Sequence, residues 1–529
     1  MNNQGRPTAP TQTAANVNTH KSASGSRGLS QVEPLIFEVG TPRRTGVDLP
    51  EPKGTKSRLG GHERTGEIGL PGLSEPQTLR HYVRLSQKNY AIDLGVYPLG
   101  SCTMKHNPRL NEKVARMPGF ADVHPLQPTS TAQGALELMY ELSHWLMTLC
   151  NMPAVALTPK AGAHGELCGM MAIRARLDAD GMSHKRRVLV PESAHGTNPA
   201  TAVQCGFSVD EIPASGNGRV DLEALREKIG TAGPDNDVAG IMLTNPNTCG
   251  LFERDIIEIA ELIHSVGGYF YCDGANFNAL VGRVRPGDLG VDAMHINLHK
   301  TFSTPHGGGG PGSGPTVLSD ALKDYAPVPY VVKTDSGYEL VENTADTKGS
   351  FGRMCAFHGQ MGMYSRALTY MMSHGADGLK QATEDAVLNA NYVQASLSDI
   401  MSPAFGGVCM HEALFDDSFL KDTGVETLDF AKAMIDEGYH PMTMYFPLVV
   451  HGAMLIEPTE SESKDELDRF IRSMRSLAER ALSAKETGNV ESFKAAPIHA
   501  PIRRLDETLA ARKPVLRWEA PNETQDAAE

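Results

Sequence analysis

The sequence predicts an α/β protein: a large domain built on a mainly parallel sheet, followed by a smaller C-terminal α/β domain. Short apolar runs alternate with longer segments of helical periodicity, which is the pattern of successive βα units. The same alternation restarts after about residue 375 and indicates the second domain. A hydrophobic content of 40% with 21% charged residues is typical of a globular chain with a sizeable core.

The elements of the large domain follow one another in a regular order. Leu136 to Leu149 place apolar residues at helical spacing and predict a long first helix. Apolar runs then predict strands at 187–190, 207–212, 238–244, 268–272 and 293–298, with helices at 221–229 and 253–266 between some of them. A parallel sheet of such strands binds ligands beyond the carboxyl ends of its strands.

The remaining elements define the ends of the chain. Helices are predicted at 361–373, 381–397, 425–437 and 461–482, and apolar runs predict strands at 405–410 and 453–457. Residues 34–72 are rich in Gly and Pro, which suits an arm that lies on another surface. We therefore expect a disordered extension at 1–33, an arm at 34–74, the large domain at 75–375, the smaller domain at 376–511 and a tail at 512–529.

The first 32 residues contain no acidic residue and are rich in Asn, Thr, Ser, Ala and Gly. A mitochondrial presequence shares this composition, but Pro7, Pro10, Gly25 and Gly28 interrupt the amphipathic helix that a presequence needs. We favour a disordered bacterial extension, and the presequence stays the alternative.

Charge and cysteine usage exclude several classes of protein. Lys and Arg total 49 against 63 Asp and Glu, and the net charge of −14 repels nucleic acid and anionic lipid. The run from His440 to Ile456 is interrupted by Pro441 and Pro447, so it does not predict a membrane span. The eight cysteines form no CxxC pair and are typical of reduced thiols, which favours a cytoplasmic protein.

A carboxylate and a lysine follow two predicted strands in succession. The apolar run 269–272 ends at Asp273, and the next run leads to Lys300. A pyridoxal phosphate enzyme needs both groups: a lysine amine that forms a Schiff base with the cofactor, and a carboxylate that keeps the pyridine nitrogen protonated. Each residue alone is as well explained by a turn or a solvated surface, but together they predict a pyridoxal phosphate site.

Two earlier segments of the sequence could contribute to the same site. Residues 159–166 place Gly162 and Ala163 where a helix begins, and the unpaired N–H groups of a helix start can bind phosphate. The segment matches neither a dinucleotide fingerprint nor a P-loop. His195 stands where another helix begins, either as a ring that stacks on the pyridine or simply as a polar group at a helix start.

Histidines and glycines near Lys300 admit other interpretations. His295, His299 and His306 have a spacing that a zinc site could use, but no carboxylate stands in an HExxH context, so we interpret the spacing as accidental. The glycine-rich run 306–315 predicts a hinge or lid at the mouth of the site.

Read together, these motifs resemble the P-protein family of the glycine cleavage system, glycine dehydrogenase (decarboxylating). The motifs are Gly100-Ser101-Cys102-Thr103-Met104-Lys105, 161–166, Ala194-His195-Gly196-Thr197-Asn198-Pro199, Thr244-Asn245-Pro246-Asn247-Thr248, Asp273-Gly274-Ala275-Asn276 and 297–302. The likeness runs from about Pro34 to about Pro501. Many P-proteins are single chains of about twice this length, and this chain resembles the cofactor-bearing second subunit of the split bacterial type.

The resemblance implies a fold of the aspartate-aminotransferase-like pyridoxal phosphate type and a role for each matching residue. The implied roles are cofactor attachment for Lys300, the pyridine partner for Asp273, ring stacking for His195, phosphate binding for Gly162 and Ala163, polar cofactor contacts for Asn297 and His299, and substrate contacts for Ser101, Cys102 and Thr103.

The implied reaction is the decarboxylation of glycine, with transfer of the aminomethyl group to the lipoyl arm of the H-protein. The resemblance also implies an obligatory first subunit in an α2β2 heterotetramer. Two alternatives share these residues or this fold. One is a decarboxylase that releases the amine to solution, and the other is a non-catalytic partner, which should lack the lysine that this chain retains at Lys300.

Overall fold

The computed structural model describes residues 32–41, 44–47, 49–50, 53–54, 56–66, 68–306 and 312–517. They form two compact units. The larger comprises 95–431 and 440–488, and the smaller comprises the described residues up to 94, 432–439 and those from 489 onward. Most of the predicted extension and tail lies outside the described residues, and the predicted domain boundaries stay a prediction. No helix among the described residues has a stretch long and apolar enough to cross a membrane.

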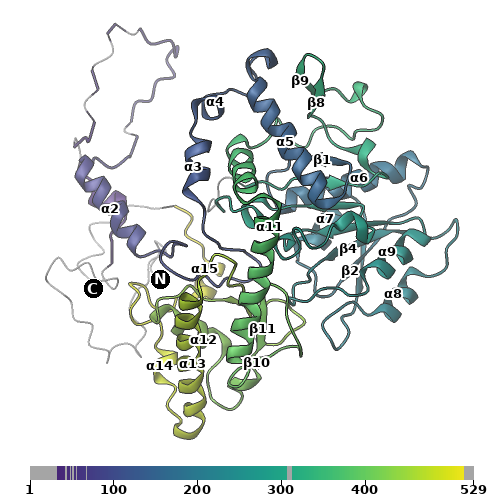
Figure 1. Cartoon of the computed structure of the whole chain (residues 1–529). Helices are drawn as coiled ribbons and strands as arrows, with labels where there is room; N and C mark the ends of the chain where they lie inside the picture. The colour runs from purple at the N-terminus through teal and green to yellow at the C-terminus, as the bar shows by residue number, and fades with distance from the viewer. Residues whose placement is uncertain are drawn as a thin grey trace. The chain divides into compact units, whose positions relative to one another are not determined.

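A seven-stranded sheet organises the larger unit, with strand order β1-β7-β6-β5-β4-β2-β3 (Figure 1). Its strands are β1 (Ala154–Ala156), β2 (Arg187–Pro191), β3 (Ser208–Ile212), β4 (Val238–Thr244), β5 (Tyr269–Asp273), β6 (Ala293–His295) and β7 (Thr316–Leu318). From β6 to β3 neighbouring strands pair in parallel, whereas β7 is antiparallel to both β6 and β1. The predicted mainly parallel sheet is confirmed.

Helices cover both faces of this sheet, which explains why its inner strands are mainly apolar, whereas the edge strand β3 contains polar residues. In β5, Tyr271 packs into the core on one face, and Phe270 and Cys272 pack into the core on the other. Both cores are dry, so neither face selects polar residues. The helices of the unit include α3 (Arg109–Ala115), α4 (Pro118–Ala121), α5 (Gln133–Cys150), α6 (Gly162–Ala179), α7 (Thr197–Gln204), α8 (Leu222–Ile229), α9 (Ile256–Ser265) and α10 (Leu298–Thr301).

A second sheet of four strands, in the order β10-β11-β13-β12, is antiparallel throughout. Its strands are β10 (Ser402–Pro403), β11 (Ala413–Asp416), β12 (Thr443–Met444) and β13 (Met454–Ile456). The helices near it in the chain are α11 (Met361–Leu397), α12 (Thr427–Asp436) and α13 (Lys464–Thr487), and α11 packs against both β11 and α13. A hairpin of β8 (Tyr330–Thr334) and β9 (Gly337–Val341) precedes them.

Two predicted elements differ from the structure. Residues 405–410 are not a strand: Gly407 has a positive φ of 91°, and the Cys409 N–H donates to the Asn391 side chain rather than to a neighbouring strand. The predicted strand at 293–298 ends at His295, because Asn297 begins α10. The two helices predicted between 361 and 397 are confirmed: they share the label α11, but the backbone of Gly375 (φ 64°, ψ −176°) is not helical and separates them.

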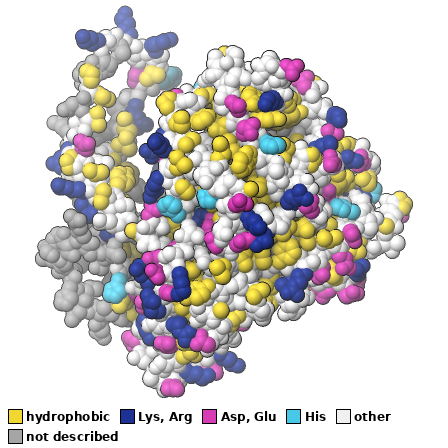
Figure 2. Space-filling model, viewed as in Figure 1, with side chains coloured by type: hydrophobic (Ala, Val, Ile, Leu, Met, Phe, Trp, Pro, Cys, Tyr) yellow, Lys and Arg dark blue, Asp and Glu magenta, His cyan; other side chains and the backbone are white. Residues whose placement is uncertain are grey.

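The smaller unit contains α1 (Ile36–Val39), α2 (Glu75–Gln87), α14 (Glu491–Lys494) and α15 (Glu507–Arg512). Glu33 accepts two hydrogen bonds of 2.6 Å from Arg84 and one of 3.0 Å from His81, so the last residue of the predicted extension, just before the predicted arm, is tied to α2. Several apolar side chains of residues 49–79 are nevertheless open at the surface (Figure 2), among them Leu49, Leu70 and Leu79.

Candidate active site

The polar side chains of the site lie where β5 and β6 end. β5 ends at Asp273, and β6 is followed by Asn297 and the short helix α10, which contains Lys300. Because β5 and β6 are parallel neighbours, their carboxyl ends lie at the same edge of the sheet. This topology brings together the two residues that the sequence singled out.

Asp273 is buried and held in its charged form. Its Oδ1 accepts a hydrogen bond of 2.9 Å from the Ala275 N–H, and its Oδ2 accepts one of 3.1 Å from Asn198 Nδ2. Burial alone would raise the pKa of Asp273, but His295, these two hydrogen bonds and the charge of Lys300 outweigh burial and lower it. An ionised carboxylate therefore faces the edge of the sheet.

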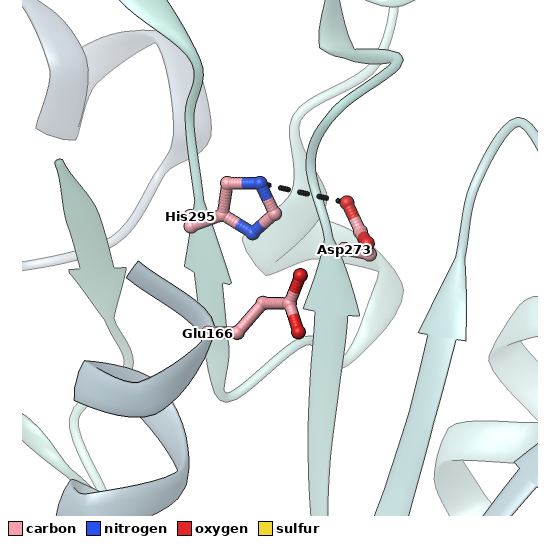
Figure 3. Close-up of side chains that lie close together, drawn as sticks. All are labelled: Glu166, Asp273 and His295. Carbon is pink, nitrogen blue, oxygen red and sulfur yellow. Dashed lines mark ion pairs between the residues drawn. The ribbon is translucent and has the colours of Figure 1, made fainter. Parts of the chain in front are cut away.

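His295 and Glu166 complete a buried polar cluster around Asp273 (Figure 3). His295 Nε2 lies 3.5 Å from Asp273 Oδ1, and His295 Nδ1 lies 2.6 Å from the Tyr271 hydroxyl. Burial raises the pKa of Tyr271 well above its ordinary value, so the phenol keeps its proton.

Lys300 reaches a loop that is far away in sequence. Its Nζ donates a hydrogen bond of 2.6 Å to the Ser101 carbonyl. Ser101 and Thr103 both have positive φ, 63° and 45°, which is uncommon for residues other than glycine. The segment 101–103, predicted to contact substrate, thus lies beside the lysine in an unusual backbone conformation.

The N-terminus of α6 meets Asn297 beside this cluster. A Cβ on Gly162 would lie 2.8 Å from Asn297 Oδ1, so only glycine fits there. Asn297 Oδ1 is buried and, among the described residues, has no hydrogen-bond donor. The first N–H groups of the helix, those of Gly162 and Ala163, have no partner within it. An unsatisfied amide oxygen and a helix N-terminus are therefore adjacent.

His195 lies at the start of α7, exposed, with its ring edge-on to Phe446 at 5.8 Å. Its Nδ1 lies 2.9 Å from Thr197 Oγ1, and that hydroxyl donates a hydrogen bond of 2.7 Å to Glu166. The buried Glu166 therefore orients the histidine through Thr197, although Glu166 was not singled out as a site residue from the sequence.

His299 is a neutral imidazole next to Lys300. Burial lowers its pKa to about 3, and His306 and Lys300 add to the effect. Its ring packs edge-on against His306, with ring centres 5.2 Å apart, and its Nδ1 faces the Ser313 N–H at 3.5 Å. His295 instead faces Asp273, and among the described residues the three histidines weighed as a zinc site do not form a cluster of converging ligand atoms.

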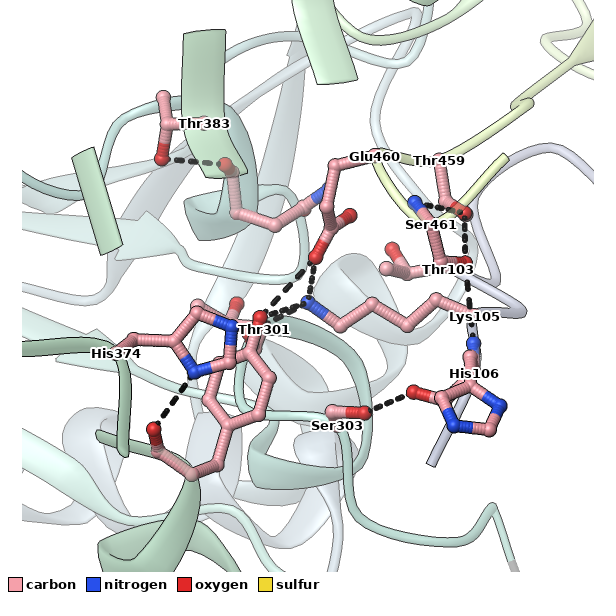
Figure 4. Close-up of polar contacts among 12 residues, drawn as sticks. Thr103, Lys105, His106, Thr301, Ser303, His374, Thr383, Thr459, Glu460 and Ser461 are labelled. Carbon is pink, nitrogen blue, oxygen red and sulfur yellow. Dashed lines mark hydrogen bonds and ion pairs between the residues drawn. The ribbon is translucent and has the colours of Figure 1, made fainter. Parts of the chain in front are cut away.

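A buried ion pair holds the end of α10 in place (Figure 4). Lys105 Nζ donates hydrogen bonds of 2.8 Å to the Thr301 carbonyl and 2.6 Å to Glu460 Oε1. It also lies 3.4 Å from the Tyr370 hydroxyl. Burial alone would lower the pKa of Lys105, but Glu460 and Tyr370 raise it. The residue after Lys300 is thereby tied to both the 101–105 segment and the C-terminal part of the chain.

The residues at this edge fit pyridoxal phosphate. An ionised Asp273 suits a protonated pyridine nitrogen, the Lys300 amine suits an aldehyde, and the start of α6 suits a phosphate. The structure brings all the predicted site residues to one edge, and their individual roles stay predictions. Sequence reasoning missed Lys105, Glu166 and His295 as parts of the site. Their only signal was their place inside the quoted motifs or next to them.

Two family models match the chain. Residues 167–309 match aminotransferase class-V, and residues 382–501 match the C-terminal domain of glycine dehydrogenase. A protein of Caulobacter vibrioides, named probable glycine dehydrogenase (decarboxylating) subunit 2, is 68% identical over 522 residues, which are 98% of each chain. A protein of the same name from Kosmotoga olearia is 50% identical over 91% of this chain and 99% of its own length.

Solved structures share the fold at low sequence identity. A glycine decarboxylase (P-protein) of the glycine cleavage system in inhibitor-bound form has a TM-score of 0.63 and 19% identity, and the match covers 82% of this chain and 91% of the other. A glutamate decarboxylase of Lactobacillus brevis has a TM-score of 0.57 and 14% identity over 82% and 96% of the two chains.

We predict that Lys105→Met destabilises the chain. The substitution leaves the Glu460 carboxylate and the Thr301 carbonyl without their buried donor, and breaking such a pair costs about 3–5 kcal/mol. Urea unfolding followed by circular dichroism measures the free energy of unfolding. Lys113→Met, at an exposed position on α3, is the matched control. A loss for Lys105→Met no greater than for the control would contradict the prediction.

Proposed function

The chain belongs to the family of glycine dehydrogenase (decarboxylating) subunit 2, and we propose that the edge of β5 and β6 is its glycine-decarboxylating site. The protein is an enzyme that decarboxylates glycine with pyridoxal phosphate in the glycine cleavage system. The observation that carries the site assignment is the meeting of the Lys300 amine and an ionised Asp273 at one edge of the sheet.

Pyridoxal phosphate, when bound, supplies an aldehyde for an amine and a ring that accepts electrons as carbon dioxide leaves. In our proposal Lys300 holds the cofactor covalently and yields it to the amine of glycine. Asp273 keeps a proton on the pyridine nitrogen, because an ionised carboxylate beside that nitrogen favours its charged form. His295, whose Nε2 lies 3.5 Å from Asp273 Oδ1, supports Asp273 in this role.

The other predicted residues have supporting roles in the proposal. Gly162 and Ala163 offer N–H groups to the phosphate, which the N-terminus of α6 also favours electrostatically. His195 stacks on the ring, held by Thr197. Asn297 and His299 are polar contacts of the cofactor, and His299 contributes no charge because its pKa is about 3.

Glycine has no side chain, so a site for it needs little room beyond its amine and carboxylate. We propose that Ser101, Cys102 and Thr103 border the substrate, because Ser101 already contacts Lys300. Burial raises the pKa of Cys102 to about 11, so its thiol stays protonated and neutral at physiological pH.

We propose that the enzyme acts with a first subunit in an α2β2 heterotetramer and passes the aminomethyl group to the lipoyl arm of an H-protein. A subunit 2 implies a subunit 1, and apolar side chains of the predicted arm such as Leu49 and Leu70 are available to a partner. A cytoplasmic location is part of the proposal. It is supported by the eight cysteines, all of them among the described residues and none in a disulfide.

Lys300→Ala should abolish covalent attachment of the cofactor without unfolding the chain. The amine is the group that bonds to the aldehyde, and we expect glycine–carbon dioxide exchange to fall by at least about 10³-fold. Borohydride reduction followed by mass spectrometry of the tryptic peptides locates any attached cofactor. Lys323→Ala removes an exposed lysine paired with Asp320 and should change nothing. Cofactor still reduced onto the Lys300→Ala chain would exclude this lysine.

Asp273→Asn should allow the cofactor to bind but weaken it as an electron acceptor. The substitution keeps the size of the side chain and removes the charge that favours a protonated ring, so we expect exchange activity to fall by about 10²–10³-fold. The assay is carbon dioxide exchange with glycine on co-expressed subunits. Asp320→Asn, at an exposed carboxylate, is the control. Turnover near that of the wild type would remove Asp273 from this role.

Activity should depend on both partners. We expect the isolated chain to bind pyridoxal phosphate but to exchange carbon dioxide poorly, and co-expression with subunit 1 to restore activity in a stable heteromer. Size-exclusion chromatography with light scattering and an exchange assay measures both properties. Adding lipoylated H-protein should raise the exchange rate further. Full activity of the chain alone would refute dependence on subunit 1, and free methylamine as the product would favour an amine-releasing decarboxylase.

A further inference from the structure

A second buried cluster lies behind the Ser101–Thr103 loop. Its residues have no role in the site as described so far. His411 and Glu412 come directly before β11, and Glu457 comes directly after β13. β11 and β13 are antiparallel, and Ala413 pairs with Ile456, so the register places Glu412 opposite Glu457. All three side chains are fully buried, and one ligand atom from each lies within 4.8 Å of the others.

The two carboxylates hold the loop by its backbone. Glu457 Oε2 accepts a hydrogen bond of 2.9 Å from the Thr103 N–H, and Oε1 accepts one of 2.5 Å from the Thr103 hydroxyl. Glu412 Oε1 accepts a hydrogen bond from the Ser101 N–H. A positive φ is unfavourable for residues other than glycine, so the conformation of Ser101 and Thr103 requires such contacts.

Burial shifts the pKa values of Glu412 and His411 toward their neutral forms. Burial first, and then repulsion from Glu457, raises the pKa of Glu412 well above its ordinary value, so Glu412 is neutral and donates its proton toward Glu457. Burial also lowers the pKa of His411, whose two ring nitrogens have no hydrogen-bond partner among the described residues.

Glu457 lies behind the atom that Lys300 contacts. A series of contacts runs from Glu457 through Thr103 to Ser101. The Ser101 carbonyl accepts a hydrogen bond of 2.6 Å from Lys300 Nζ. Glu412 fixes the same residue from its N–H side. Any change in the pair therefore moves the carbonyl that faces the lysine.

We propose that Glu412 and Glu457 are a proton-sharing pair of positioning residues that holds the Ser101 carbonyl against Lys300 and supplies a buried negative charge to balance the lysine. The proposal rests on the proposed function, because it assigns the pair to the lysine that bears the cofactor. Neither glutamate touches the reacting atoms. Their effect is exerted through the Ser101–Thr103 loop and through the electrostatic field at Lys300.

A cation held by His411, Glu412 and Glu457 is the competing explanation. The oxygens of Glu457 already accept three hydrogen bonds, two from Thr103 and one of 3.3 Å from Asn278 Nδ2. A metal ion would compete with these donors and would add positive charge near Lys300. The observations favour a shared proton, and metal content is made an outcome of the test.

The test compares Glu457→Gln with Glu412→Gln in the co-expressed holoenzyme. The absorbance of bound pyridoxal phosphate is titrated with pH, since it reports protonation at the Lys300 nitrogen. Glu457→Gln removes the charge that favours the cation and should lower the titration midpoint by about one pH unit. Glu412→Gln replaces a neutral acid by a neutral amide and should lower it by less than about 0.3 unit. Glu479→Gln, exposed on α13, is the surface control.

Other titratable groups near the pair and Lys300 must be held constant across these variants. They are Cys102, Cys249, Cys409, His299, His306, His411, Asp273 and Glu460. None of them is altered by the substitutions, so the difference between the two glutamine variants isolates the pair. Exchange kinetics should distinguish the two glutamine variants in the same way, with a fall in kcat of about tenfold or more for Glu457→Gln.

Infrared spectroscopy keeps the proposal testable if Glu457→Gln does not fold. The wild type at neutral pH should show the carbonyl stretch of a protonated carboxyl that is absent from Glu412→Gln. Equal midpoints for the two variants, or no such band in the wild type, would overturn the proposal. Stoichiometric metal in the purified wild type, lost in both variants, would replace it by a cation site. Failure of the wild type to bind pyridoxal phosphate would instead contradict the proposed function.

Discussion

Keeping Asp273 charged at a buried sheet edge is the constraint on which the rest of the site depends. An isolated carboxylate in a low-dielectric interior would gain a proton, so it needs fixed partners. Asp273 has His295, Asn198 and a backbone N–H for this purpose. The topology of the sheet supplies them, because parallel neighbours end at one edge.

The C-terminal sheet contributes to the same constraint from the opposite side. Glu457 and Glu412, at the ends of β13 and β11, hold the backbone that faces Lys300. Glu460, shortly after them, pairs with Lys105 and holds the carbonyl that follows the lysine in α10. The antiparallel sheet is therefore part of the site's architecture, and its buried acids set the position of the segment 101–105.

Much of the fold was predictable because the core imposes a simple pattern. Strands β2, β4 and β5 are buried on both faces, and such strands appear in the sequence as uninterrupted apolar runs. The pattern failed where local backbone chemistry prevails. The run at 405–410 is apolar enough for a strand, but its glycines and the Asn391 side chain hold it in an irregular loop. Ile296 and Leu298 are apolar as well, yet the chain turns into α10 there, with Asn297 as the N-cap.

The sequence by itself determined the fold class, the family and the pyridoxal phosphate chemistry, because Lys300, Asp273 and their motifs are local signals that need no partner to be read. Only the tertiary structure revealed Glu412, Glu457, His295 and Lys105 as neighbours of the site. Their contacts with residues 101, 103, 273 and 301 join distant parts of the chain or successive strand ends, and depend on strand register and burial. No spacing along the chain encodes such pairings, since a buried charge finds its partner only once the sheets have formed.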